Sequence, residues 1–345
     1  MRNSPKNCIL LGNGIHRCFG GEGWTKFLES ITTEAMKELL LSRANEIVPS
    51  LEESIDLEKL LENIKCPAPL LATLLTEDSL DVSLRKKANQ YLAGTEDGTA
   101  WSISITNSER NLLQALLELE IEDIFTTNYT YELEMADIYP VQFTRTMRKK
   151  MQEHTATVSR AENKYLYHTY NCLKNAKKRV WHIHGEMDKP DSMILGHYYY
   201  SKNIHNMENQ LEKEPIKPDN LEGDKESWLK MFLTANVFCI GFSCDLSEHD
   251  MWWLLNRKAR EKENCGKVYF YAPKSKGFDT KIELMRVMKN VTTSEPLFEI
   301  IDFNRVNSDN FNWEEFYYMA LEDIRERIAT QKQTINETER ELLFV

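Results

Sequence analysis

The fold of this chain is indicated first by a series of short apolar segments, each bounded by glycine, proline, asparagine or charged residues. They are Cys8–Leu11, Ile124–Thr127, Val180–Ile183, Met193–Leu195, Val237–Phe242, Val268–Tyr271 and Glu299–Phe303. Each is too short for a helix and is rich in β-branched or aromatic residues, which predicts buried strands. Helical patterns lie between them, and capping boxes begin at Thr106 and Asn312. The alternation predicts an α/β fold with a Rossmann-like, mainly parallel sheet.

Two longer segments interrupt this alternation. Residues 33–107 have helical patterning without a convincing strand, so we expect a helical insertion after the first strand. Residues 143–178 are polar and basic, and we expect a second helical insertion or a mobile lid there. The charged segment 206–225 contains two prolines, which is typical of a surface loop. We therefore expect residues 1–345 to form a single domain with these insertions.

Composition excludes several classes of protein. A chain of 345 residues that is 41% hydrophobic and 28% charged has the make-up of a soluble globular protein. No apolar run approaches the roughly 20 residues that span a bilayer, and the N-terminus lacks a signal-peptide pattern, so we expect a cytoplasmic protein with no membrane partner. The net charge of −11 argues against direct nucleic-acid binding. We interpret the basic cluster Arg145–Lys150 as a solvated face.

The seven cysteines are scattered along the chain. No pair has the two-residue gap of a zinc knuckle, and several lie inside apolar runs, as Cys239 does. We expect most of them to be buried free thiols in a reducing compartment, with no structural metal.

Glycines and small polar residues follow two of the expected strands. Gly12-Asn13-Gly14 comes directly after Cys8–Leu11, and Gly241-Phe242-Ser243 is followed by Asp245. In open α/β sheets the carboxyl ends of the strands form the ligand crevice, and glycines let the backbone approach a phosphate. The structural alternative is a pair of tight turns, because the third glycine of the usual dinucleotide fingerprint is not in place. Asp245 and Asp250 have an alternative role as helix caps.

Two further strand ends carry side chains suited to chemistry. Asn128 follows Thr127 and either faces a bound nucleotide or caps the next helix. His182 and His184 lie two residues apart, which places both on one face of a strand, a geometry that zinc sites also use, but no third ligand is nearby. His184, at the strand end, suits proton transfer because its unperturbed pKa is about 6.5. The alternative is a hydrogen-bonded structural histidine, and we favour that role for His182.

In their order along the chain, these motifs resemble those of the sirtuin-like superfamily. The matching segments are Gly12-Asn13-Gly14-Ile15, Thr126-Thr127-Asn128-Tyr129, His182-Ile183-His184-Gly185 and Gly241-Phe242-Ser243 with Asp245. With Gly23-Trp24 and Leu28 after it, the first segment is most similar to bacterial sirtuin-like proteins, many of them NAD⁺ hydrolases of anti-phage defence. The resemblance runs from about Cys8 to Ala272 and implies a sirtuin-like fold.

The resemblance also implies roles for individual residues. Gly12, Asn13 and Gly14 would lie on the NAD⁺ pyrophosphate. Asn128, with Thr127 beside it, would position the nicotinamide ribose and the attacking water. His184 would be the catalytic histidine. The adenosine side would be lined by Gly241, Ser243 and Asp245.

Departures from the family pattern bear on the reaction. Sirtuin deacylases carry Cys-x-x-Cys pairs of a zinc ribbon after the histidine, whereas residues 185–193 contain no cysteine. Loss of the ribbon, which shapes the acyl-lysine cleft, argues against deacylation. Thr130 stands where many relatives have aspartate, and Asn13 and His16 replace the commoner alanine and serine, so the ribose contacts differ in detail.

The resemblance therefore implies hydrolysis of the nicotinamide–ribose bond of NAD⁺ to nicotinamide and ADP-ribose, with NAD⁺ as substrate and no metal. The alternatives are a module that binds NAD⁺ or ADP-ribose without cleaving it, and a zinc-free deacylase or ADP-ribosyltransferase. A free NAD⁺ hydrolase is toxic unless restrained, so we expect a homo-oligomer, with a motor ATPase as a candidate partner. Adjacent Trp252 and Trp253 cannot share one narrow helical stripe and would offer apolar surface.

Overall fold

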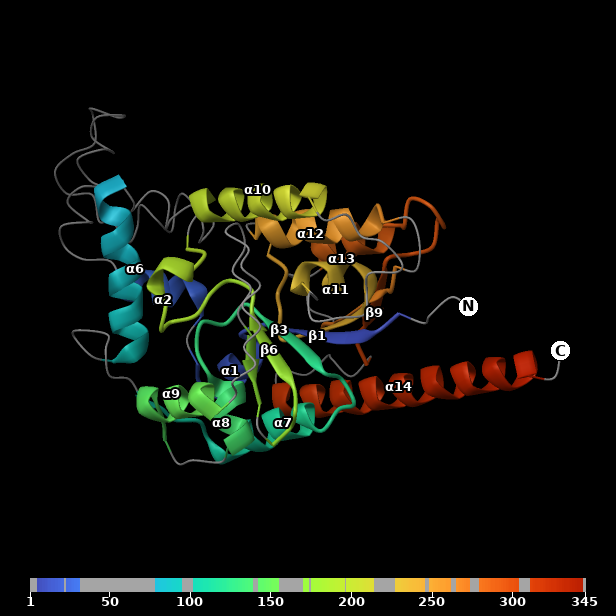
Figure 1. The fold of residues 1–345 in the computed structure, drawn as a ribbon, viewed down its shortest axis with the longest axis horizontal. Helices are drawn as coiled ribbons and strands as arrows, with labels where there is room; N and C mark the ends of the chain where they lie inside the picture. The colour runs from blue at the N-terminus through green and yellow to red at the C-terminus, as the bar shows by residue number, and fades with distance from the viewer. Residues whose placement is uncertain are drawn as a thin grey trace.

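The computed structural model describes residues 5–21, 23–31, 78–94, 102–138, 142–154, 170–173, 175–195, 197–213, 227–245, 248–261, 265–273, 279–303 and 311–343. Within these ranges the chain has the predicted α/β fold, a seven-stranded and mostly parallel sheet flanked by helices (Figure 1). A short antiparallel ribbon, formed by β2 (Ser102–Ile103) and β4 (Phe143–Thr144), lies outside this sheet.

The order of the strands in the main sheet defines where its direction reverses. The strands are β1 (Asn7–Leu11), β3 (Asp123–Thr126), β5 (Tyr170–Cys172), β6 (Arg179–His182), β7 (Asn236–Ile240), β8 (Val268–Tyr271) and β9 (Phe298–Ile301). They lie in the order β5-β6-β3-β1-β7-β8-β9, and only β5 is antiparallel to its neighbour. The chain builds outward from β1 through β3 to β6, then returns to β7 on the other side of β1. Apart from the edge strand β5, this is the strand order of dinucleotide-binding folds, with its reversal between β1 and β7.

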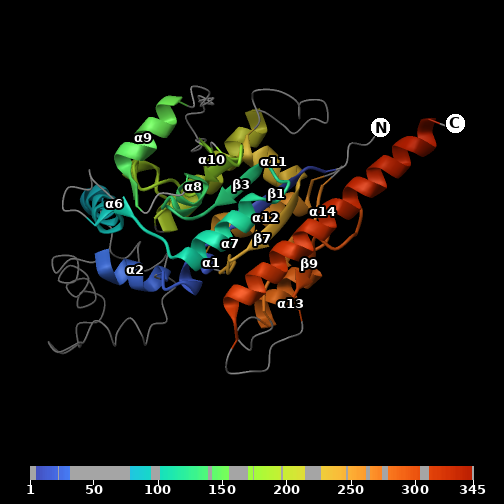
Figure 2. The same cartoon turned by 90° about the horizontal axis from the view of Figure 1, so that it is seen from below.

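Helices cover both faces of the sheet (Figure 2). One face carries α10 (His197–Lys213), α11 (Trp228–Thr234), α12 (His249–Ala259) and α13 (Asp279–Val287). The other carries α7 (Asn107–Leu117), α8 (Glu132–Ile138) and the long α14 (Trp313–Leu343). The remaining elements are α1 (Gly14–Cys18), α2 (Trp24–Ile31), α6 (Asp78–Ala93), α9 (Arg145–His154) and the 3₁₀ turn η1 (Pro190–Ser192). Of these, α2 and α6 lie towards the end of the molecule where the parallel strands finish.

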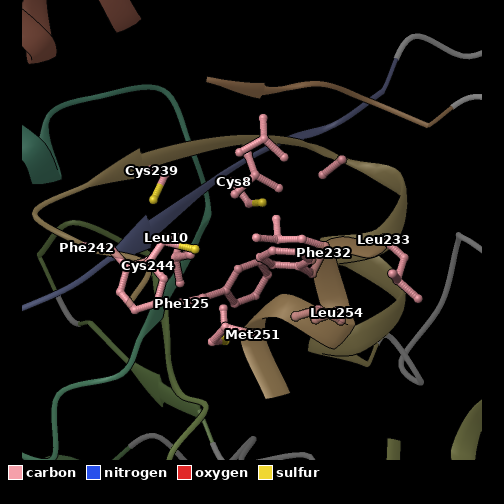
Figure 3. Packing of buried hydrophobic residues seen from close by; sticks show 14 of the residues in the cluster. Cys8, Leu10, Phe125, Phe232, Leu233, Cys239, Phe242, Cys244, Met251 and Leu254 are labelled. Atoms are coloured by element: carbon pink, nitrogen blue, oxygen red, sulfur yellow. The ribbon is translucent and has the colours of Figure 1, made fainter. Parts of the chain in front are cut away.

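Side chains alternate between the two faces of the sheet along each strand, so each face has its own hydrophobic core. In β1, Cys8 and Leu10 belong to the cluster under α11 to α13, whereas Ile9 and Leu11 belong to the cluster under α7 and α14. In the first cluster Phe125, which pairs with Leu10 across the β1–β3 ladder, lies against Phe232 with ring centroids 6.2 Å apart (Figure 3). A strand buried on both faces needs an apolar residue at nearly every position, which explains the continuous apolar runs in the sequence.

The predicted helix starts are confirmed. The Thr106 hydroxyl accepts a hydrogen bond from the Glu109 amide at 3.1 Å, directly before α7. The Asn312 side chain accepts from the amides of Glu314 and Glu315 at 3.1 and 3.2 Å, directly before α14. Both helices therefore begin where a side chain satisfies otherwise unpaired N–H groups.

Some sequence predictions are wrong. Met193–Leu195 is not a strand; it is a buried loop after η1, held by a bond from the Ile194 amide to the His184 carbonyl at 2.9 Å. Residues 143–178, expected to be helical or a lid, contain strands β4 and β5 besides α9, with residues 155–169 outside the described part. Residues 206–213 belong to α10 and not to a loop. Most of the predicted insertion 33–107 lies outside the described residues, which there include α6 and β2.

The basic cluster at the start of α9 is only partly a solvated face. Lys149 and Lys150 are exposed, but the Arg148 side chain is 4% exposed. Its guanidinium pairs with the carboxylates of Glu186 and Asp188, the latter at 2.6 Å. Arg148 therefore connects α9 to the loop after β6 through a buried network of ion pairs.

The described cysteines and the adjacent pair Trp252 and Trp253 are buried or partly buried. Cys8, Cys239 and Cys244 are buried free thiols, as expected, whereas Cys18, Cys172 and Cys265 are partly buried. Trp252 and Trp253 both pack, partly buried, against the core cluster under α12, so they do not form the expected exposed apolar pair. Among the described residues, no helix is both long and apolar enough to cross a membrane.

Candidate active site at the carboxyl edge of the sheet

Two glycine turns meet where the sheet order reverses. The Gly14 amide donates to the Gly241 carbonyl at 2.6 Å, and the Gly12 amide donates to the Ile240 carbonyl at 3.0 Å. A Cβ added to Gly12 would lie 2.5 Å from the Gly241 oxygen, and one added to Gly14 would lie 2.6 Å from it. Gly241 itself has a φ of +65°, which favours glycine. Glycine is needed here because the turns after β1 and β7 pack backbone against backbone.

The other residues predicted to bind the dinucleotide surround these turns. Asn13 precedes α1 at its N-cap position and is half-buried, with no side-chain bond to the helix amides. Thr127, also half-buried, donates its amide to the Leu11 carbonyl at 3.4 Å. On the β7 side, Ser243 is exposed. The structure therefore brings Asn13 and Thr127 to one strand-end region with Gly12, Gly14 and Gly241.

A pocket opens beside this junction, between the ends of β1 and β3. It is lined by Leu11, Gly12, Ile15, His16, Glu109, Leu113, Thr126, Asn128, Thr130, Glu132 and Leu133. Its empty space of about 310 Å³ includes open solvent, and the enclosed part is about 10 Å³, room for about one water molecule. Asn128 is half-buried, and its amide donates to the Thr126 hydroxyl at 3.1 Å. Since α8 begins at Glu132, Asn128 stands in the loop before it and is not its N-cap.

The pocket carries opposite charges from three elements. Nδ1 of His16, on α1, lies 2.8 Å from Oε1 of Glu109 on α7. The hydrogen bond with Glu109 raises the pKa of His16 to about 9, although burial opposes the shift. Burial raises the pKa of Glu132, on α8, while His16 and a hydrogen bond with the Thr130 side chain oppose that shift. At neutral pH the pocket therefore holds an imidazolium paired with one carboxylate, next to a second carboxyl group.

His182 has the structural role that we favoured for it. Its Nδ1 lies 2.7 Å from the Asn128 carbonyl oxygen, and its Nε2 lies 3.0 Å from Oε1 of Glu134. Its ring also meets that of Tyr131 edge-to-face, with centroids 5.4 Å apart. Both neighbouring oxygen atoms are hydrogen-bond acceptors. Both nitrogens are thus used within the fold.

His184 lies in a different environment. Its ring is 3% exposed and meets the Tyr200 ring of α10 edge-to-face, with centroids 5.6 Å apart. Nε2 lies 3.1 Å from Oδ2 of Asp250 on α12, outside hydrogen-bonding geometry. Burial lowers the pKa of His184, but the Asp250 and Glu248 carboxylates outweigh it and raise the pKa overall. His184 is therefore buried between β6 and the helices of the second face, and does not stand at an open crevice lip.

The prediction that His182 and His184 share one face of a strand is wrong. β6 ends at His182, and Ile183 and His184 form a turn before Gly185, whose φ is +88°. His182 consequently contacts α8, whereas His184 contacts α10 and α12 on the opposite face of the sheet. The period of two holds only while the backbone stays extended.

Asn128 and His184 are related through the register of their strands. Thr126 pairs with His182 in the parallel β3–β6 ladder, and each of the two predicted catalytic residues follows its strand by two positions. Both therefore leave the same edge of the sheet from neighbouring strands. Only Asn128, however, lines the pocket beside the glycine turns.

The aspartates after β7 do not cap α12 through their side chains. Asp250 is fully buried and accepts from the Asn203 side chain at 2.8 Å and from the Met251 amide at 2.8 Å. Asp245 is exposed, and its carboxylate pairs with Lys281 at 2.9 Å. Glu248 stands at the N-cap position, and burial raises its pKa to about 7 against the opposing effect of His184. Asp250 and Glu248 therefore form the acidic surroundings of His184.

Sequence reasoning missed the charged groups of the pocket. His16 was visible only as a departure from the family pattern, and Glu109 was interpreted as half of a capping box. Glu132 had no signal of its own, because carboxylates at the start of a helix are common. Their proximity depends on which helices flank the β1–β3 junction, and short-range patterns do not encode that.

Among the described residues, no group of His, Cys, Asp and Glu side chains is arranged to hold a metal ion. Comparison with protein-family models and with curated proteins finds no match to this chain.

Proposed function

We propose that the chain is an NAD⁺ hydrolase that cleaves the nicotinamide–ribose bond, giving nicotinamide and ADP-ribose. The observation that carries this proposal is the reversal of strand order between β1 and β7, with Gly12, Gly14 and Gly241 at that point. Dinucleotides bind at such reversal points in open α/β sheets, with the pyrophosphate at the first turn. In this assignment the pyrophosphate lies on Gly12-Asn13-Gly14, with Thr127 beside it and Ser243 and Asp245 towards the adenosine.

The nicotinamide ribose would then lie at the opening of the Asn128 pocket, whose enclosed part has room for a water molecule. The pocket adjoins Gly12 and lies on the β3 side of the reversal point, so one molecule that spans β1 reaches both places. The backbone of Asn128 is held by its contacts with the Thr126 hydroxyl and the His182 ring. A positioned amide can hold a ribose hydroxyl and a water molecule without adding charge.

The proposed reaction needs no covalent bond between the protein and the ribose. Nicotinamide departs as a neutral molecule from a positively charged ring, leaving an oxocarbenium-like ribose that water captures. Carboxylates close to the pocket stabilise that positive charge in a low-dielectric site. Glu109 and Glu132 are so placed, with exposures of 2% and 6%. The family resemblance assigns His184 as the base or hydroxyl partner, and Asp250 and Glu248 favour its charged form.

Incubation of the purified full chain with NAD⁺, followed by chromatography, tests this function. We expect equimolar nicotinamide and ADP-ribose without any acceptor. Product that forms only when a peptide or protein acceptor is added would replace hydrolysis by acyl or ADP-ribosyl transfer. NAD⁺ binding without any product would leave a nucleotide-binding module.

We further propose that activity is restrained by assembly into a homo-oligomer, because an unrestrained NAD⁺ hydrolase depletes the cell that makes it. Light scattering at micromolar concentration, with and without NAD⁺, tests this. A monomer under both conditions would contradict it.

A further inference from the structure

In the pocket of Asn128, the carboxyl group of Glu132 is also a candidate proton acceptor. Glu132 begins α8 and lines the pocket together with Asn128 and Thr130. Glu132 is 6% exposed, so it is shielded from bulk solvent. His184, the histidine that the family resemblance assigns as base, is absent from that lining and lies against Tyr200 and Asp250.

The groups that face Glu132 prepare it for proton transfer. Glu109 from α7 is already paired with His16 from α1 at 2.8 Å, so that pair is close to neutral as a unit. The second carboxyl group is left with the Thr130 hydroxyl as a hydrogen-bond donor. Burial and the Glu109 charge raise the pKa of Glu132, with burial the larger effect, while His16 opposes them. A carboxylate whose pKa moves towards the working pH is a better general base than an ordinary one.

From this placement we infer that the Glu132 carboxylate is the proton acceptor for the attacking water in the proposed NAD⁺ hydrolysis, on which this inference rests. The bond between the ribose C1′ and the nicotinamide nitrogen breaks, and its electron pair neutralises the pyridinium ring. The water oxygen bonds to C1′, and one water proton passes to the Glu132 carboxylate, which later returns it to solvent. Asn128 holds the water and the ribose on one side of this path.

The His16–Glu109 pair has a positioning role in this assignment. By holding Glu109 in an ion pair, His16 leaves Glu132 as the carboxylate with capacity for a proton. Because His16 lies on α1, two residues after Gly14, the pair connects the proposed pyrophosphate site to the proposed base.

The test compares nicotinamide release by the full-length wild type, Glu132→Gln and the matched control Glu122→Gln. Glu122 is exposed and precedes β3 at the opposite end of the strand, so the same isosteric change there leaves the pocket intact. We expect Glu132→Gln to lower kcat by about a hundredfold or more, with NAD⁺ affinity by calorimetry and the melting temperature close to wild type. Glu122→Gln should release nicotinamide at the wild-type rate.

Rescue by azide distinguishes a role of Glu132 as general base from a purely structural role. Azide is already ionised, so it attacks C1′ without giving up a proton, and the products are nicotinamide and ADP-ribosyl azide. We expect added sodium azide to restore nicotinamide release in Glu132→Gln and to change the wild-type rate little. If Glu132→Gln unfolds, Glu132→Asp keeps the carboxylate and should retain part of the activity.

The outcomes distinguish this inference from the proposed function. An active wild type together with a folded, fully active Glu132→Gln would overturn the role of Glu132 and leave the hydrolase intact. An inactive Glu132→Gln that binds NAD⁺ but is not restored by azide would also overturn it. A wild type that releases no nicotinamide under any condition would overturn both proposals.

Discussion

Nδ1 of His182 lies 2.7 Å from the carbonyl oxygen of Asn128, and this contact joins the end of β6 to the loop after β3. On its other side the same ring meets Oε1 of Glu134 at 3.0 Å. The histidine that does not line the pocket therefore positions the asparagine that does. Burial is the largest single effect on the pKa of Glu134, on α8, and raises it, but His182, Asn171 and a backbone hydrogen bond together lower the pKa below its ordinary value.

Replacement of His182 by alanine should first lower stability. Glu134 would remain buried without its histidine partner, and leaving a buried polar group without its hydrogen bond costs about 1–3 kcal/mol, more for a charged group. Urea unfolding measures the change in the free energy of unfolding. Lys332→Ala is the control, since Lys332 and Glu120 form a solvent-exposed pair that contributes little to stability. Equal, small losses in both variants would contradict the structural role of His182.

The glycine turns at the sheet reversal should tolerate no side chain. In Gly12→Ala the new methyl group would lie 2.5 Å from the Gly241 oxygen, so the two turns must separate. We expect a loss of about 1–3 kcal/mol from overpacking together with weaker NAD⁺ binding, measured by thermal melts and calorimetry. Gly23→Ala is the matched control, because its methyl group would meet only the Arg17 side chain at 3.5 Å. Comparable melting temperatures for the two variants would show that the turns do not pack as described.

The His16–Glu109 pair should make stability depend on pH. The pKa of His16 rises from 6.5 to about 9 on folding, because its hydrogen bond with Glu109 outweighs burial. Its stabilising contribution is therefore complete below pH 6.5 and is lost as pH rises through about 9. Urea unfolding of wild type and His16→Gln should show a difference in unfolding free energy that shrinks across this window. His205→Gln, at an exposed site, should show no such trend, and a difference for His16→Gln that grows with pH would refute the pairing.

The rate of nicotinamide release should fall on the acid side of neutrality. Burial raises the pKa of Glu132 above 4.5, its ordinary value, and protonation removes its ability to accept a proton from water. His16, Glu109 and Thr130 are the groups that share its surroundings, and His16, whose pKa is raised to about 9, stays charged over this range. A profile of kcat against pH should therefore have an acid limb with a midpoint above pH 4.5. An acid limb of kcat with its midpoint at or below pH 4.5 would contradict the role of Glu132 as base. The same acid limb in Glu132→Gln as in the wild type would contradict it as well.

Local sequence signals predicted the frame of the molecule well. The apolar segment Val268–Tyr271 is a strand with those bounds, and Thr106 caps α7 as its capping box indicated. These features depend on neighbouring residues alone. Met193–Leu195 has the composition of a strand, but tertiary contacts keep it in a loop, because its amides bond to η1 and to the end of β6. Composition does not distinguish a buried loop from a buried strand.

The candidate site was predictable to the extent that it follows strand ends. Gly12, Asn128 and Gly241 lie at the carboxyl edge because parallel strands bring their ends together. The orientation of His184 was not predictable, since it depends on one turn directly after β6. The charge of Arg148 likewise suggested solvent, and its burial depends on carboxylates that follow it by about forty residues.

Nicotinamide release from NAD⁺ by the purified full-length chain, compared with that by Asn128→Ala, tests the central claim most directly. Asn256→Ala, an exposed asparagine on α12, is the control for the substitution itself. We expect nicotinamide release by the wild type and by Asn256→Ala. For Asn128→Ala we expect a rate of release lower by about a hundredfold or more, at an unchanged melting temperature. Equal release by folded Asn128→Ala and wild type, or none by any of the three chains, would contradict it.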